Sequence, residues 1–284
     1  MTARKTFFLL AGFFLVLAVI SAIIALLQRE MPLRDRIALV RIEGPIITSK
    51  SAVEEIKGYA KDKSIKAIVL RVESPGGGVV ASQEIHNEVK KAADVKKVVV
   101  SMGSVAASGG YYVSVPASQI IANPGTITGS IGVIMEIPNI KGLMDKIGVT
   151  TEVIKSGRHK DLASVFRGIG REEREILQGV MDDVHQQFIQ AVAEGRKLPP
   201  ERVRKIADGR VFSGRQAKEA GLIDDLGDLE YSLSAAAKMV GIKGEPEVVT
   251  KKERGTLMQL LDSAFGDRVM KVLPQAELKY LYSP

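Results

Sequence analysis

The sequence predicts an α/β fold, because strand-like and helix-like segments alternate along the chain from about residue 36 onward. Runs of β-branched residues indicate buried strands, and apolar residues at three- and four-residue spacing indicate helices. Stretches of glycine and other small residues separate these segments. The sequence shows no internal repeat and no low-complexity tract, so we expect one catalytic domain around one core.

The individual elements follow from these patterns. The expected strands are Ile37–Ile42, Ile65–Val72, Lys97–Met102, Ile120–Asn123, Thr128–Met135 and Thr151–Ile154. The expected helices are Ser51–Ala60, Ser82–Ala92, Arg171–Glu194, Pro200–Ala207, Gly214–Ala220 and Leu229–Val240. Two small-residue loops, Ser74–Gly78 and Ser101–Gly110, each follow a strand and precede a helix. Loops in that position line the carboxyl ends of parallel strands, where binding sites gather.

An apolar segment precedes this domain. Phe7–Leu27 contains 21 residues without a charged side chain, which at 1.5 Å per residue is roughly the thickness of the hydrocarbon core. Arg4 and Lys5 precede it, so the positive-inside rule predicts a cytoplasmic N-terminus and an extracytoplasmic domain. A cleaved signal peptide is the alternative, although its apolar core usually has only about 7–15 residues.

We therefore expect four parts along the chain. Residues 1–28 form a cytoplasmic tip and a transmembrane anchor, 29–35 a linker, 36–248 the catalytic domain, and 249–284 a charged segment with an amphipathic tail. The tail has one apolar helical face, formed by Leu257, Leu260, Leu261, Ala264, Phe265 and Val269. Such a face packs on its own core, on a sister subunit or in a groove.

Composition excludes several classes of function. The chain has no cysteine, which excludes thiol catalysis, disulfides and Cys-based zinc sites. The formal charge of +7 is scattered among acidic residues, aromatic residues make up only 5%, and tryptophan is absent, which argues against nucleic-acid binding. We expect no cofactor and no metal.

A hydrolase without cysteine needs a hydroxyl nucleophile, a base and hydrogen-bond donors for an oxyanion. Met102–Tyr112 offers Ser104 and Ser108, of which only Ser108 is followed by a glycine pair whose amide can face an oxyanion. The same stretch could be a helix start that packs closely on the sheet. Gly76–Gly78 supplies further amides, which suit an oxyanion or a phosphate, although the Walker lysine is missing.

The general base is less well determined by the residues themselves. His86 and His185 lie in polar helix-like segments, where a solvated side chain is expected. His159 and Lys160 adjoin in a loop after an apolar strand. A lysine acts as a base only where apolar surroundings favour its neutral form, and a hydroxyl such as that of Ser130 can orient the neutral amine. Local chemistry leaves both His159 and Lys160 open.

Four segments together resemble a known family. In order and spacing they are similar to signal peptide peptidase A in its short bacterial and archaeal form. The segments are Ser74–Gly78, Met102–Tyr112, Ser156–Asp161 and Asp208–Gly214, and the resemblance covers roughly Arg36–Val240. It implies a fold like that of the Clp protease proteolytic subunit and the crotonases, built from repeated ββα units.

The resemblance also implies a Ser-Lys dyad in place of a triad. Carried over by motif, the nucleophile is Ser108, the general base is Lys160, Ser130 orients the lysine amine, and the amides of Gly77 and Gly109 form the oxyanion hole. It further implies homo-oligomers with active sites between protomers. The implied substrates are remnant signal peptides and other apolar peptides, reached from a cell membrane whose lipid contacts residues 7–27.

Two other functions are compatible with the same segments. A crotonase-like acyl-CoA enzyme would use the glycine amides to polarise a thioester, and it would require a cytoplasmic site. A non-catalytic membrane scaffold of the same fold would need neither Ser108 nor Lys160. For the protease, we expect small or apolar side chains around the cleaved bond, and the C-terminal tail is a candidate for occluding the site or being processed by it.

Overall fold

The computed structural model describes residues 12–22, 35–251 and 279–281. They belong to two units, Met1–Asp35 and Arg36–Pro284. Residues 12–22 are helical, and among the described residues no helix is both long and apolar enough to cross a membrane. The rest of the span predicted over Phe7–Leu27 lies outside the described residues, as does the apolar face predicted over Leu257–Val269.

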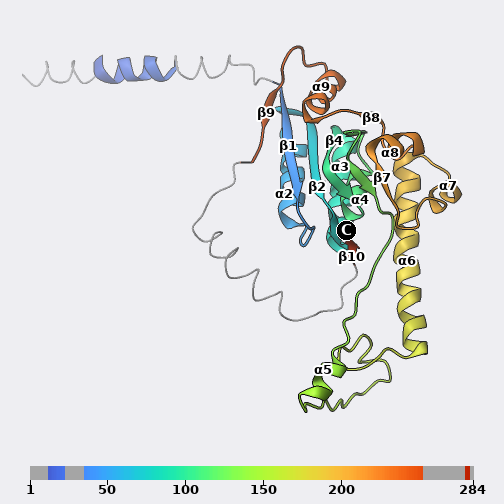
Figure 1. Cartoon of the computed structure of the whole chain (residues 1–284). Coiled ribbons are helices and arrows are strands. Elements are labelled where there is room, and N and C mark those ends of the chain that lie inside the picture. Colours follow the sequence, from blue (N-terminus) through green and yellow to red (C-terminus); the bar gives the residue numbers. More distant parts are fainter. Residues whose placement is uncertain (1–11, 23–34, 252–278, 282–284) are drawn as a thin grey trace, which may run out of the picture. The chain divides into compact units, whose positions relative to one another are not determined.

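A mixed sheet is the centre of the second unit (Figure 1). Its described strands are β1 (Arg36–Glu43), β2 (Ile65–Ser74), β4 (Lys97–Ala107), β5 (Gln119–Ala122), β6 (Ile127–Gly129), β7 (Val211–Ser213), β8 (Asp225–Leu226) and β9 (Glu247–Val249). The main order is β7-β6-β4-β2-β1-β9, with β5 paired to β4 and β8 to β5. All pairs are parallel except β6 with β7. The predicted α/β class is therefore confirmed.

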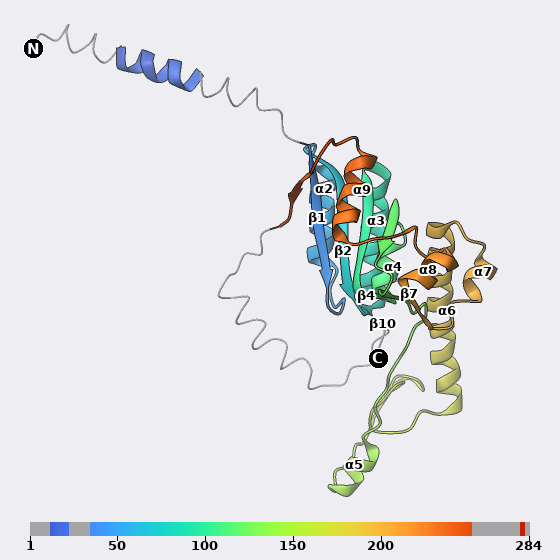
Figure 2. The same ribbon diagram turned by 45° about the horizontal axis from the view of Figure 1, so that its top comes forward.

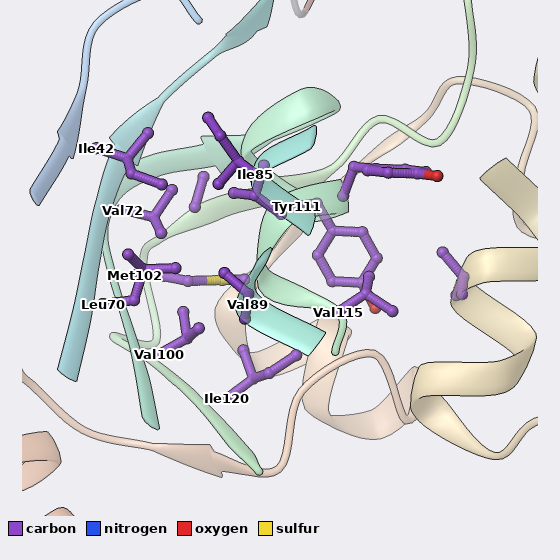
Figure 3. Packing of buried hydrophobic residues seen from close by; sticks show 14 of the residues in the cluster. Ile42, Leu70, Val72, Ile85, Val89, Val100, Met102, Tyr111, Val115 and Ile120 are labelled. Carbon is purple, nitrogen blue, oxygen red and sulfur yellow. The ribbon is translucent and has the colours of Figure 1, made fainter. Parts of the chain in front are cut away.

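Helices cover both faces of this sheet. The described helices of the second unit are α2 (Lys50–Lys61), α3 (Val79–Val95), α4 (Gly109–Ser114), α5 (Lys141–Lys146), α6 (Arg171–Arg196), α7 (Pro200–Arg204), α8 (Gly214–Ala220) and α9 (Leu229–Met239). Because successive side chains of a strand point to opposite faces, Leu70 and Val72 pack toward α3, whereas Val69 packs toward α9. Figure 3 shows the first of these layers, with Ile85 of α3 beside Val72.

A second, two-stranded sheet joins segments that are distant in the sequence. β3 (Gly76–Gly78) pairs antiparallel with β10 (Lys279–Leu281), and Tyr280 is opposite Gly77. On its other side, β3 is bridged to Ile46. Residues from the C-terminus of the chain thus lie beside the glycine loop that follows β2.

Most predicted elements are confirmed, and three predictions are wrong. β4 continues to Ala107 through part of the stretch predicted as a loop, because it pairs there with β6. The strand predicted over Thr128–Met135 ends at Gly129, where Ser130 takes a positive φ of 51° and turns the chain. Thr151–Ile154 is not a strand: it lies at the surface, Ile154 is 96% exposed, and none of the described strands pairs with it.

Residues 135–168, called the arm below, project from the sheet and contain α5. Figures 1 and 2 show the arm extending away from β4 and returning to the start of α6. Every residue of the arm is exposed or half-buried. Its apolar residues include Leu143, Ile147 and Ile154, which are 60%, 62% and 96% exposed. Within one copy of the chain, the arm therefore has no buried hydrophobic core.

Candidate active site

Ser108 lies between the end of β4 and the start of α4. Its φ of 52° and ψ of −115° are outside the regions that L-residues favour. Two backbone hydrogen bonds fix it: Ser108 N donates to Gly129 O at 2.8 Å, and Tyr112 N donates to Ser108 O at 2.8 Å. The residue is 1% exposed. A strained residue that its surroundings hold this firmly is typical of a functional site.

The glycines after Ser108 permit close approach of other backbone. A methyl group on Gly109 would lie 2.6 Å from Ser82 Oγ and 3.1 Å from Gly77 N, and one on Gly110 would lie 2.7 Å from Ser74 O. The backbone oxygen excludes a side chain at Gly110, and a side chain at Gly109 would have to displace the Ser82 hydroxyl and crowd Gly77. The glycine pair therefore brings the start of α4 against β3 and the end of β2.

The loop Gly76–Gly78 is extended, and the backbone N–H and C=O groups of Gly77 face β10. Ile46 N donates to Gly76 O and Gly78 N donates to Ile46 O, both at 2.8 Å. Since successive peptide groups alternate along a strand, the amide of Gly77 faces the other side, where Tyr280 pairs with it. An extended strand is not the concave nest that a phosphate would need.

The carbonyl of Tyr280 lies where the predicted oxyanion donors meet. A methyl group on Gly76 would be 1.9 Å from Tyr280 O and 2.7 Å from Gly109 N. Tyr280 O, Gly77 and the amide of Gly109 are thus neighbours at the end of β4.

The side chain of Tyr280 fills an aromatic pocket. Its ring stacks on Tyr112 with centroids 5.1 Å apart, lies 4.7 Å from the ring of Phe188, and is fully buried. Its hydroxyl donates to Val184 O at 3.2 Å. Burial raises the pKa of the Tyr280 phenol, so the hydroxyl keeps its proton at neutral pH. The pocket accepts a large aromatic side chain and offers one carbonyl to a hydroxyl.

His86 forms part of the wall behind this pocket. Its ring lies 4.7 Å from that of Tyr112, and the residue is only 8% exposed. Burial lowers the pKa of His86, which favours the neutral ring. The prediction of a solvated His86 is wrong because His86 follows Val79 and Ser82 on the inward face of α3.

Ser130 lies next to Ser108. Ala107 pairs with Gly129 in the sheet, so the two serines follow neighbouring strand residues. Ser130 also has a positive φ, and its N donates to Arg210 O at 2.9 Å. It lines a surface hollow of about 530 Å³ together with Asp182, His185 and Asp208. The structure therefore brings Ser108, Ser130, Gly77 and Gly109 together at one end of the sheet.

The structure does not bring Lys160 to these residues within one copy. Lys160 is an exposed residue of the arm, and its N donates to Gly157 O at 3.1 Å. The neighbouring Asp161 is engaged elsewhere: it accepts from Lys155 Nζ at 2.5 Å and from Arg167 Nε at 2.9 Å. No carboxylate hydrogen bond or ion pair to Lys160 is present in the described part of the chain.

The other two histidines do not form a triad with Ser108. His159 Nε2 is 3.4 Å from Glu172 Oε1 at the base of the arm. His185 lines the hollow beside Ser130, and its Nε2 has no hydrogen-bond partner among the described residues. Within residues 12–22, 35–251 and 279–281, no group of three His, Asp or Glu side chains could hold a metal ion.

The segment Asp208–Gly214 supports Ser130, a role that sequence reasoning missed. It contains β7, which pairs antiparallel with β6, and a methyl group on Gly129 would lie 2.6 Å from the ring of Phe212. Val211 and Phe212 have high strand propensity, but three residues are too short for a strand signal, so the sequence offered little to reveal this role.

Several known proteins similar to this chain are named as proteases. The model of "Peptidase family S49" matches residues 90–243. A Synechocystis protein named "Putative protease" is 44% identical over 74% of this chain and 76% of its own length. Protease 4 of Salmonella typhi is 38% identical over 82% of this chain, and the chloroplastic serine protease SPPA of Arabidopsis thaliana is 35% identical over 74%. The matches span only 38% and 33% of these two proteins.

Among solved structures, a ClpP1 mutant from Listeria monocytogenes has a TM-score of 0.47 and 18% sequence identity to this chain. The match covers 68% of this chain and 93% of that one.

Proposed function

Because the chain belongs to peptidase family S49 and several of its relatives are named as proteases, we propose that it is a serine endopeptidase in which Ser108 is the nucleophile and Lys160 the general base. The observation that carries this proposal is the carbonyl of Tyr280, which lies against Gly76 and the Gly109 amide at the end of β4. A peptide strand that pairs with β3 in the same way presents its carbonyl carbon to Ser108.

The reaction uses Ser108 at the end of β4 and Lys160 on the arm. Ser108 Oγ attacks the peptide carbonyl while neutral Lys160 accepts the hydroxyl proton. The amides of Gly77 and Gly109 stabilise the oxyanion of the tetrahedral intermediate. When the carbon–nitrogen bond breaks, Lys160 gives the proton to the leaving amine. A water that gives a proton to the same lysine then hydrolyses the ester, which frees the new carboxylate and restores the Ser108 hydroxyl.

A second copy supplies Lys160 in this proposal. Two observations support it: the arm carries Lys160 on an exposed surface with the apolar Ile147 and Ile154, and the hollow beside Ser130 receives no lysine from its own chain among the described residues. Burial of the arm against a neighbour would exclude water from the amine, as a neutral base requires. Monomers are inactive on this account.

Complementation tests the shared site. Ser108→Ala and Lys160→Ala variants are each inactive, but after they are unfolded together and co-assembled, about a quarter of the sites combine an intact Ser108 with an intact Lys160 if mixing is random. Recovery of about a quarter of the wild-type activity is expected. Absence of recovery in mixtures shown to contain both variants in one oligomer would place both residues of each site in one copy.

We also propose that the enzyme is anchored in the cell membrane and cleaves remnant signal peptides on the extracytoplasmic side. The support is the uncharged run Phe7–Leu27 preceded by Arg4 and Lys5, together with β3, which pairs with an extended segment of the chain, Lys279–Leu281. The full-length chain in detergent should cleave a synthetic signal peptide and should leave a charged peptide of equal length intact. Equal cleavage of both would contradict this substrate class.

A further inference from the structure

A bulge interrupts β4 shortly before the nucleophile. β2 and β4 pair in register up to Val72 with Met102, and the next pair is Ser74 with Ala106. On β4 the residues Gly103–Val105 therefore lie opposite the single residue Glu73 of β2, and they form the bulge. At this point the opposite edge of β4 changes partner, from β5 to β6. Bulges redirect strands next to functional sites, and this one directs β4 toward Ser108.

The carboxylate of Glu73 holds the bulge. Ser104 N donates to Glu73 Oε2 at 2.9 Å, and Val105 N donates to Oε1 at 3.1 Å. Neighbouring amides of a regular strand point to opposite sides, so both can reach one carboxylate only where the backbone turns. A methyl group on Gly103 would lie 1.7 Å from Glu73 Oε2, so the carboxylate fits only against a glycine.

Arg71 and Thr126 hold the same bulge from two other sides. Arg71 Nη1 donates to Met102 O at 3.2 Å, and its Nη2 lies 3.7 Å from Glu73 Oε2. Thr126 Oγ1 donates to Gly103 O at 2.7 Å. The bulge thus has defined partners for its amides and for its first carbonyl.

Glu73 is also covalently joined to the segment that leads to the oxyanion loop. The next residue, Ser74, accepts a hydrogen bond from Gly76 N at its Oγ, at 3.1 Å. We propose that Glu73 is a positioning residue, whose carboxylate fixes Ser108 relative to the amides of Gly77 and Gly109. This inference rests on the proposed serine protease function.

The Glu73→Gln variant tests the role of the two oxygens. It keeps the shape of the side chain but replaces one acceptor with an NH₂ group that would face a backbone N–H. Because a misplacement of about 1 Å can cost about 10²-fold in rate, kcat should fall about 10- to 100-fold while KM changes less than about twofold. Glu73→Asp, which keeps both acceptors on a shorter chain, should restore part of the loss.

Glu43 offers a matched control. It is opposite Glu73 in the register of β1 and β2, and its carboxylate pairs with the exposed Arg41 at 3.3 Å. Glu43→Gln should retain wild-type kcat. An unchanged kcat in Glu73→Gln, or an equal loss in Glu43→Gln, would overturn the proposed role.

Two measurements on the full-length chain in detergent separate this inference from the proposed function. In Glu73→Gln, hydrogen exchange should be faster at residues 103–107 and unchanged in β1 and α9. A serine-directed phosphonate should label Ser108 more slowly than in the wild type, and the labelling rate should fall by about the same factor as kcat. Wild-type protein that is not labelled at Ser108 contradicts the protease. Labelling and exchange in Glu73→Gln that equal the wild-type values contradict the positioning role alone.

Discussion

The two regions that carry the proposed dyad are built in opposite ways. Around Ser108, backbone hydrogen bonds hold the chain, the neighbouring glycines let other backbone approach closely, and Ser108 is 1% exposed. Around Lys160, every residue of the arm is exposed or half-buried, and the structure is held by ion pairs at its base. In the proposed mechanism, one copy of the chain preorganises the nucleophile and the oxyanion hole, whereas the proposed base needs surroundings that one copy does not provide.

The largest expected effect comes from removing either half of the dyad. Ser108→Ala should abolish peptide cleavage, and Lys160→Ala should lower kcat about 10²- to 10⁴-fold, the range that a general base contributes. Lys146→Ala, another exposed lysine of the arm, should leave kcat unchanged. Initial rates on a fluorogenic signal-peptide analogue measure all three. Substantial activity in Lys160→Ala would show that the arm does not supply the base.

A smaller but large effect should distinguish glycines of the two regions. Gly109→Ala places a methyl group 2.6 Å from Ser82 Oγ and 3.1 Å from Gly77 N, so it displaces the oxyanion amides and should lower kcat about 10²-fold. Gly142→Ala, in α5 of the arm, meets nothing within 4 Å and should leave kcat unchanged. Equal kcat values in the two variants would mean that close backbone approach at Gly109 is not needed for catalysis.

The same contrast explains how much of the fold and site could be predicted from sequence. The strand Ile65–Val72 and the helix Gly214–Ala220 were predictable because apolar periodicity and helix caps are local signals. Ser108 and Gly109 could be selected because small residues after a strand are also a local signal. The proximity of Ser130 to Ser108 required the register of β4 and β6, which joins residues about 20 positions apart.

Predictions failed where a distant partner decides the conformation. Glu73 looked like any charged strand residue, since only the bulge of β4 gives its carboxylate two amides. His86 was predicted to be solvated because its neighbours are polar, whereas Tyr112 of α4 packs on its ring, and Phe188 of α6 packs on Tyr112. Thr151–Ile154 contains the β-branched Thr151, Val153 and Ile154, but it pairs with no strand in the part of the chain that the structure describes.

A moderate effect is expected from the tail that lies beside β3. We propose that β10 competes with substrate, so Tyr280→Ala should lower the apparent KM roughly tenfold, since a tethered segment acts at an effective concentration near the millimolar range. Tyr231→Ala, which removes an exposed tyrosine of α9, should leave KM unchanged. An unchanged KM in Tyr280→Ala would show that the tail does not occlude the groove.

The mass of the purified protein tests processing of the same tail. If the site cleaves it, wild-type protein should lack C-terminal residues that the Ser108→Ala variant keeps. Identical C-termini in the two proteins would count against self-processing.

The smallest expected effect is that of low pH on the ion pairs at the base of the arm, and it tests what keeps the arm in place. Hydrogen bonds from Arg167 and then Lys155 hold the pKa of Asp161 well below its usual range, and those from Arg167 and the Gly170 amide lower the pKa of Glu173 to about 2. Both carboxylates have lower pKa values folded than unfolded. Their contribution is therefore complete above about pH 5 and is lost as the pH falls from about 4 toward 2.

A spin label can follow this loss, since the chain has no cysteine of its own. A nitroxide on Ile154→Cys, close to Lys155, should keep constant mobility from pH 8 to about pH 5 and become more mobile as the pH falls below about 4. With Arg167→Gln added, the label should be mobile already at neutral pH. The outcome bears on catalysis, because a base on a projecting arm reaches its partner only if that arm keeps one shape. Mobility that is equal at pH 7 with and without Arg167 would mean that another contact, such as a neighbouring copy, holds the arm.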